Sequence, residues 1–146
     1  MTASLPICDI IKRCRTVAVV GLSPKPERES HQVGCFLQAR GYRIIPVNPG
    51  QKEILGEPCY GALTEIPEPV EVVNVFRRSE AIAPIAEEAM QIGARVFWMQ
   101  LGIRNDGVAE KLRTAGVTVV MDRCIKIDYL HCYSDLHQED RAHSGL

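Results

Sequence analysis

Five short runs of mostly β-branched and apolar residues recur along this 146-residue chain, and residues that favour turns bound each of them. Such runs are typical of buried β-strands. The first and last are apolar almost throughout, as in a parallel sheet, because helices cover both faces of such a sheet. The predicted strands are residues 16–20, 42–47, 71–76, 95–99 and 117–121.

Segments with apolar residues at helical spacing lie between these strands, and most begin at a capping residue and stop at a glycine. Between the second and third strands the pattern supports only a single helical turn, around residues 62–66. A leading helix is expected over residues 7–12, a trailing one over 125–131, and a polar, frayed tail over 138–146. The capped segments run from Ser30 to Gly41, from Ser79 to Gly93, and from Asn105 or Asp106 to Gly116.

This alternation predicts an α/β protein: a Rossmann-like, doubly wound parallel sheet of five strands, within one domain that spans residues 1–146. Right-handed crossovers leave few strand orders, and we expect 3-2-1-4-5, numbered along the chain. In such sheets, ligands bind outside the carboxyl ends of the strands, where the order reverses. The ligand crevice should therefore lie between the loops that follow the first and fourth strands.

Charge and composition argue against several classes of partner. With 17 basic and 18 acidic residues, the formal net charge is −1, so no basic field recruits nucleic acid or anionic membranes. No apolar run approaches the ~20 residues that a membrane span needs. Residues 1–7 are too short and too interrupted to form a secretory leader. We therefore expect a cytoplasmic protein.

The six cysteines include no Cys-x-x-Cys pair, which argues against a thioredoxin-like site and most structural zinc sites. A chain that can build a full core and shows no export signal is expected to keep its thiols reduced. The densest group of cysteines and histidines matches no zinc spacing, so we predict no metal site. That group is Cys124, His131, Cys132 and His137.

The loop after the first predicted strand has the features of a phosphate site. Gly21 allows close approach of the backbone, Ser23 offers a hydroxyl, and Lys25 and Arg28 supply positive charge. A helix that starts at Ser30 would present unpaired N–H groups and a partial positive charge to an anion. The alternative interpretation is that the glycine and the prolines of this loop only shape a turn.

A dinucleotide-binding fingerprint does not fit the same loop. Counted from Gly21, the pattern Gly-x-Gly-x-x-Gly would need glycines where Ser23 and Pro26 stand. The acid expected after the second strand is replaced by Asn48-Pro49-Gly50, and Lys52 is close by. These residues disfavour NAD and leave NADP open.

The ends of the third and fourth predicted strands contribute further candidate ligand-binding residues. The third strand ends in Arg77 and Arg78, whose guanidinium groups suit bidentate recognition of phosphate, although paired arginines are also common on solvated loops. After the fourth strand, Gln100 offers an amide and Gly102 a close backbone approach. Trp98 could lie against a ligand or belong to the core.

Five motifs occur in order between Ile7 and Tyr133: Val19-Val20-Gly21-Leu22-Ser23, Val47-Asn48-Pro49, Asn74-Val75-Phe76-Arg77, Trp98-Met99-Gln100-Leu101-Gly102 and Asp122-Arg123-Cys124-Ile125-Lys126. Together they resemble the small CoA-binding domain family, which is similar to the N-terminal domain of the succinyl-CoA synthetase alpha subunit. The resemblance implies a Rossmann-like fold and CoA, or an acyl-CoA, as the ligand. By motif, the contacts would come from the loop after Trp98 and from Gly21, Ser23, Asn48, Pro49, Phe76 and Arg77.

The sequence does not indicate chemistry beyond binding. In the synthetase, a phosphorylated histidine lies on a second domain and the nucleotide site on another subunit, and this chain matches neither. Its residues show no recognisable nucleophile–base pair and no clustered carboxylates. His31, at a predicted helix start, could touch a phosphate or only solvent. We therefore predict a stand-alone CoA-binding module, a carrier, sensor or regulatory partner of a further protein, rather than an enzyme.

Two alternatives stay open at this point. One is a fragment of an NADP-type oxidoreductase that uses the same crevice. The other is a thiol-based redox or CoA-disulfide protein built on Cys124, because Arg123 and Lys126 would favour a thiolate there.

Overall fold

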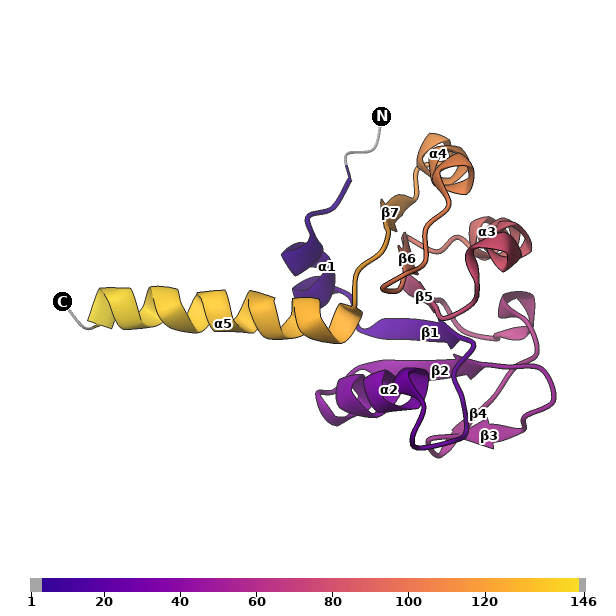
Figure 1. Ribbon diagram of the computed structural model, residues 1–146, viewed down its shortest axis with the longest axis horizontal. Coiled ribbons are helices and arrows are strands. Elements are labelled where there is room, and N and C mark those ends of the chain that lie inside the picture. The colour runs from indigo at the N-terminus through magenta and orange to yellow at the C-terminus, as the bar shows by residue number, and fades with distance from the viewer. Residues whose placement is uncertain (1–3, 145–146) are drawn as a thin grey trace.

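The computed structural model describes the backbone of residues 4–144 and the side chains of residues 4–134. Its centre is a sheet of five strands in which every neighbouring pair is parallel, with helices on both faces (Figure 1). This confirms the predicted α/β class and all five predicted strands. They are β1 (Thr16–Val20), β2 (Arg43–Val47), β5 (Val72–Val75), β6 (Val96–Met99) and β7 (Thr118–Val120).

The predicted strand order, 3-2-1-4-5, is wrong. The observed order is β2-β1-β5-β6-β7, so the third long strand lies beside the first, with Val17 paired to Val72. Right-handed crossovers permit both orders, and what differs is the face of the sheet over which the chain leaves β2. Here it crosses the opposite face from the first crossover helix. The connection contains β3 (Glu53–Ile54), β4 (Glu57–Pro58) and the 3-10 turn η1 (Leu63–Glu65).

Side chains alternate along each strand between two hydrophobic cores, one on each face of the sheet. Val17 and Val19 pack in the core beneath α1, α2 and α5, whereas Ala18 and Val20 pack in the core beneath η1, α3 and α4. Figure 1 shows these two helical layers on either side of the strands. The helices are α1 (Ile7–Arg13), α2 (Glu29–Ala39), η2 (Ser79–Ala81), α3 (Ile82–Gln91), α4 (Asp106–Thr114) and α5 (Ile125–Ser144).

The predicted helix caps have mixed outcomes. Asn105 caps α4, since its side-chain oxygen accepts a hydrogen bond of 3.1 Å from the Val108 N–H. Ser30 instead lies inside the first turn of α2, and Ser79 begins η2 rather than capping α3. The backbone of α5 continues as helix through residues 138–144, which were expected to fray, and extends away from the sheet (Figure 1). The last two residues of that predicted tail lie outside the described residues.

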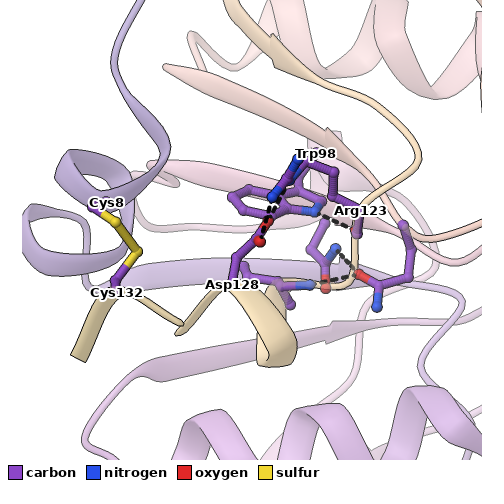
Figure 2. A network of polar contacts seen from close by, with 8 residues as sticks. Cys8, Trp98, Arg123, Asp128 and Cys132 are labelled. Atoms are coloured by element: carbon purple, nitrogen blue, oxygen red, sulfur yellow. Dashed lines mark hydrogen bonds and ion pairs between the residues drawn. A yellow bond between two sulfur atoms is a disulfide. The ribbon is translucent and has the colours of Figure 1, made fainter. Parts of the chain in front are cut away.

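The prediction that all six cysteines are free thiols is wrong for two of them. Cys8 in α1 and Cys132 in α5 form a disulfide, with their Cα atoms 5.5 Å apart (Figure 2). The two cysteines are separated by 124 residues, and only the packing of α1 against α5 brings them together. The disulfide also takes Cys132 out of the cysteine–histidine group, and the side chain of His137 lies outside the described residues.

Within the residues that the structure describes, no three His, Cys, Asp or Glu side chains gather as a metal site would require. No helix among the same residues combines the length and the apolar character needed to cross a membrane.

Candidate functional site

The observed strand order places the reversal point between β1 and β5, and two loops meet there. Gly21 directly follows β1 and has φ +89°, a backbone conformation that residues with a side chain rarely adopt. A Cβ at this position would lie 3.1 Å from the Phe76 carbonyl oxygen and 3.2 Å from Arg77 Nε. The loop after β1 therefore packs against the loop after β5. The predicted opposite wall, the loop after β6, lies one strand further away.

A cleft of about 410 Å³ opens above this contact. It gathers eight of the predicted site residues, together with Glu29, which is not among the predicted residues. The lining residues are Gly21, Ser23, Lys25, Arg28, Glu29, Ser30, Asn48, Phe76 and Arg77.

Short hydrogen bonds hold the first loop of the cleft in place. The hydroxyl of Ser30 accepts a bond of 3.0 Å from the Ser23 N–H, and the Ser23 hydroxyl accepts one of 3.1 Å from the Lys25 N–H. His31 Nδ1 lies 2.8 Å from the Ser23 carbonyl oxygen, so His31 supports the loop from within α2. Asn48 Nδ2 donates to the Leu22 carbonyl at 2.9 Å. These hydrogen bonds within the chain fix the conformation of the cleft wall.

The electrostatics of the cleft favour an anion. Lys25, Arg28 and Arg77 all line it, against the single carboxylate of Glu29. Among the ion pairs between described residues, none uses any of these three cations. The N-terminus of α2 adds unpaired N–H groups and its partial positive charge. Free positive charge beside a helix start is the arrangement that binds phosphate groups.

A second, more apolar pocket of about 250 Å³ adjoins the cleft, because Arg77 lines both. Pro49, a predicted site residue, belongs to this pocket. The connection between β2 and β5 supplies part of its wall, and the N–H of Leu63 in that connection is fixed by a 2.8 Å bond to Glu88 of α3. The other lining residues are Val20, Val47, Gly61, Ala62 and Ile85. The sequence does not predict this pocket, because no local pattern places the connection on this face of the sheet.

Comparison with known proteins identifies the domain. Residues 15–129 match the family described as the CoA binding domain. The chain belongs to the CoA-binding domain family. Its relatives include the uncharacterized protein YneT of Bacillus subtilis (strain 168), 47% identical over 121 residues, which are 83% of this chain and 90% of YneT.

Two further relatives place the domain in different contexts. The ADP-forming acetate–CoA ligase I of Archaeoglobus fulgidus is 31% identical over 74 residues, which are 51% of this chain but only 11% of the ligase. The structure of a hypothetical protein from Pyrococcus horikoshii OT3 superposes with a TM-score of 0.85 at 33% identity, covering 91% of this chain and 99% of that one. Relatives of this CoA-binding domain thus occur both in a large ligase and in chains of similar length.

Three predicted contact residues of the CoA-binding domain line neither the cleft nor the apolar pocket. Arg78 is exposed, precedes η2 and lines neither pocket. The Gly102 N–H donates to Asp122 at 2.7 Å, which ties the loop after β6 to the end of β7. Gln100 is buried, with 2% of its surface exposed. Gly102 and Gln100 follow β6, so the corrected strand order explains their displacement.

The carboxyl end of β6 instead anchors the start of α5 (Figure 2). The indole Nε1 of Trp98 donates to the Arg123 carbonyl at 2.8 Å, and the Arg123 guanidinium donates to both carboxylate oxygens of Asp128, at 2.7 and 2.8 Å. The Ile125 N–H donates to Gln100 Oε1 at 3.3 Å. Trp98 is fully buried, so of its two predicted roles the core role is confirmed.

Two of the free cysteines, Cys124 and Cys59, do not have the surroundings of an activated thiolate. Cys124 is 8% exposed, and the guanidinium of its neighbour Arg123 is already paired with Asp128. Cys59 is half-buried, and its thiol donates to the carbonyl of Asn48 at 3.4 Å. Burial raises the pKa of the Cys59 thiol, which keeps it protonated.

Proposed function

We propose that this chain binds CoA, or an acyl-CoA, as a stand-alone module that does not itself turn its ligand over. The observation that carries the proposal is the pairing of a cationic cleft with an apolar pocket that share Arg77. CoA combines three phosphate groups with a flat adenine ring, and these two chemistries match the two spaces. Membership of the CoA-binding domain family supports the same ligand.

The phosphates would lie at the start of α2, within reach of Lys25, Arg28 and Arg77. The open turn at Gly21 lets a phosphate approach the backbone closely. The adenine would occupy the neighbouring pocket between Pro49 and the β2–β5 connection. The pantetheine arm would then leave from the phosphate end of the cleft.

The non-catalytic part of the proposal rests on the groups around the cleft. His31 contacts the carbonyl oxygen of Ser23 rather than its hydroxyl, so it is not placed as a general base for that hydroxyl. Cys124 and Cys59 lack the exposed, electropositive setting that a reactive thiol needs. Such a site binds the ground state of its ligand and gains nothing specific to a transition state.

Titration calorimetry of CoA with two neighbouring variants tests the binding site. Arg77→Ala should weaken CoA by about 10- to 150-fold, the usual value of a charge-assisted hydrogen bond. Arg78→Ala is the matched control, since Arg78 is exposed and lines neither pocket, and it should change the affinity less than twofold, about the noise of a surface substitution. Equal effects of the two substitutions would contradict this placement. Tighter binding of NADP than of CoA would replace the proposed ligand.

Turnover is tested separately with the wild-type chain. Acyl-CoA should be recovered unhydrolysed, and CoA disulfide should not be reduced catalytically when a dithiol is supplied. Release of free CoA by the wild type, lost in Cys124→Ser, would show that the thiol-based alternative is correct.

A further inference from the structure

Two buried amide side chains beside the cleft have hydrogen-bonding atoms without partners. Asn74 in β5 is fully buried and Gln100 after β6 is 2% exposed. Asn74 Nδ2 donates to Gln100 Oε1 at 3.2 Å, and the Ile125 N–H donates to the same oxygen at 3.3 Å. Within the described part of the chain, Asn74 Oδ1 and Gln100 Nε2 have no hydrogen-bond partner.

The orientation of both amides follows from the backbone. The Ile125 N–H needs an acceptor, so the oxygen of Gln100 must face it. Asn74 must then turn its NH2 group toward that oxygen, because the opposite orientation would bring two oxygens together. The pair therefore presents one free acceptor, Asn74 Oδ1, and one free donor, Gln100 Nε2.

Such a pair is costly unless something binds it. Leaving a buried donor or acceptor unpaired destabilises the folded state, and native structures retain few such groups. The surrounding core, which includes Trp98 and Val19, would accept an apolar side chain at position 74, whereas Gln100 is already needed by the Ile125 N–H. A polar pair at this point is therefore expected to serve a partner that offers one donor and one acceptor.

The strand register puts the pair next to the cleft. Val75 pairs with Met99, so Gln100 is level with Phe76, which lines the cleft, at the usual ~4.8 Å spacing of neighbouring strands. Asn74 precedes Phe76 by two residues and shares its face of the sheet. Phe76 packs on the same core as this face, so it separates the cleft from the amide pair.

We propose that Asn74 and Gln100 recognise an amide group of the pantetheine arm of CoA. This inference rests on the proposed CoA binding. The arm carries two secondary amides, and each offers one N–H donor and one carbonyl acceptor. Asn74 Oδ1 accepts the amide N–H, and Gln100 Nε2 donates to the amide carbonyl. Both groups are closed over in this structure, so the side chain of Phe76 must shift to admit the arm. The pair thereby distinguishes CoA from nucleotides that lack the arm.

The test compares two ligands on each variant by titration calorimetry: CoA, and 3′-phosphoadenosine 5′-diphosphate, which has the same adenosine and phosphates but no arm. Asn74→Val removes the free acceptor with a residue that suits a buried strand. The affinity of this variant for CoA should fall about fivefold, as expected for one lost hydrogen bond, and the affinity for the nucleotide without the arm should not change. Its melting temperature should not fall, because a buried orphan atom is removed. Arg77→Ala is the control, since it should weaken both ligands alike.

Other outcomes would overturn the inference. An equal loss for both ligands would mean that Asn74 only supports the fold of the cleft, and unchanged affinities would mean that the pair serves an internal water. If Asn74→Val does not fold, Asn74→Ala, which is smaller than the native residue and also lacks the acceptor, provides the same comparison. Failure of the wild type to bind CoA would refute the proposed function itself, which is a separate result.

Discussion

Breaking the disulfide between Cys8 and Cys132 should cost this protein a large part of its stability. The cross-link joins residues 124 apart, so it closes a loop that includes the whole parallel sheet. In the chain-entropy account, a cross-link restricts the unfolded chain, and a loop of this length corresponds to about 5 kcal/mol at 25 °C. Measured values are usually smaller, so we expect a loss of about 3–5 kcal/mol. For a chain of this size, that corresponds to a fall in melting temperature of roughly 10–15 °C.

The assay is thermal unfolding followed by circular dichroism, for the oxidised wild type with and without a dithiol and for Cys8→Ser. The oxidised protein should titrate four thiols after denaturation, those of Cys14, Cys35, Cys59 and Cys124. Cys35→Ser is the matched control, because Cys35 is exposed and free, and its melting temperature should equal that of the wild type. Six titratable thiols in the oxidised protein, or equal melting temperatures for Cys8→Ser and Cys35→Ser, would refute the reasoning.

Three further changes test other parts of the structure. Gly21→Val should abolish CoA binding in calorimetry and cost about 1–2 kcal/mol of stability, because its Cβ would be strained at φ +89° and would meet Phe76; unchanged affinity would contradict this. Burial raises the pKa of Tyr42 to about 12, so the fold favours its neutral phenol. The contribution of the neutral Tyr42 phenol to the free energy of unfolding is complete below pH 10 and is lost as the pH rises to about 12. Urea unfolding of the wild type should therefore show a loss of about 2 kcal/mol over this pH range, and Tyr42→Phe should not show it. Asn105→Ala should lower the free energy of unfolding by about 1 kcal/mol, whereas Asn105→Ser should restore the cap of α4.

Local patterns in the sequence were enough to predict the strands and the phosphate-binding loop. The apolar run that ends at Gly21 and the loop from Ser23 to Ser30 are set by neighbouring residues, and the structure keeps them together in one cleft. Arg77 was also identified, because any strand of a parallel sheet delivers its last residues to the same edge.

What the sequence could not predict depends on distant contacts. No periodicity states which side of β1 receives β5, so Gln100 was expected to face the loop at Gly21 and instead lies one strand further on, under α5. The same holds for Cys8 and Cys132, whose proximity depends on the packing of the first helix against the last. To predict the apolar pocket, one would need the path of the connection between β2 and β5, and most of that connection is irregular.

The interior position of β1, between β2 and β5, has a consequence for how the chain is made. This strand is synthesised first, yet Val17 pairs with Val72, which lies 55 residues further along. At a bacterial or eukaryotic translation rate of roughly 5–20 residues per second, about 3–10 s pass between the synthesis of β1 and that of β5, and during this time the edge of β1 that binds β5 is unpaired. During that time an unpaired, almost wholly apolar strand is available to other nascent chains. Slower translation between residues 48 and 71 should therefore increase aggregation, and a chaperone that shields residues 16–20 should reduce it.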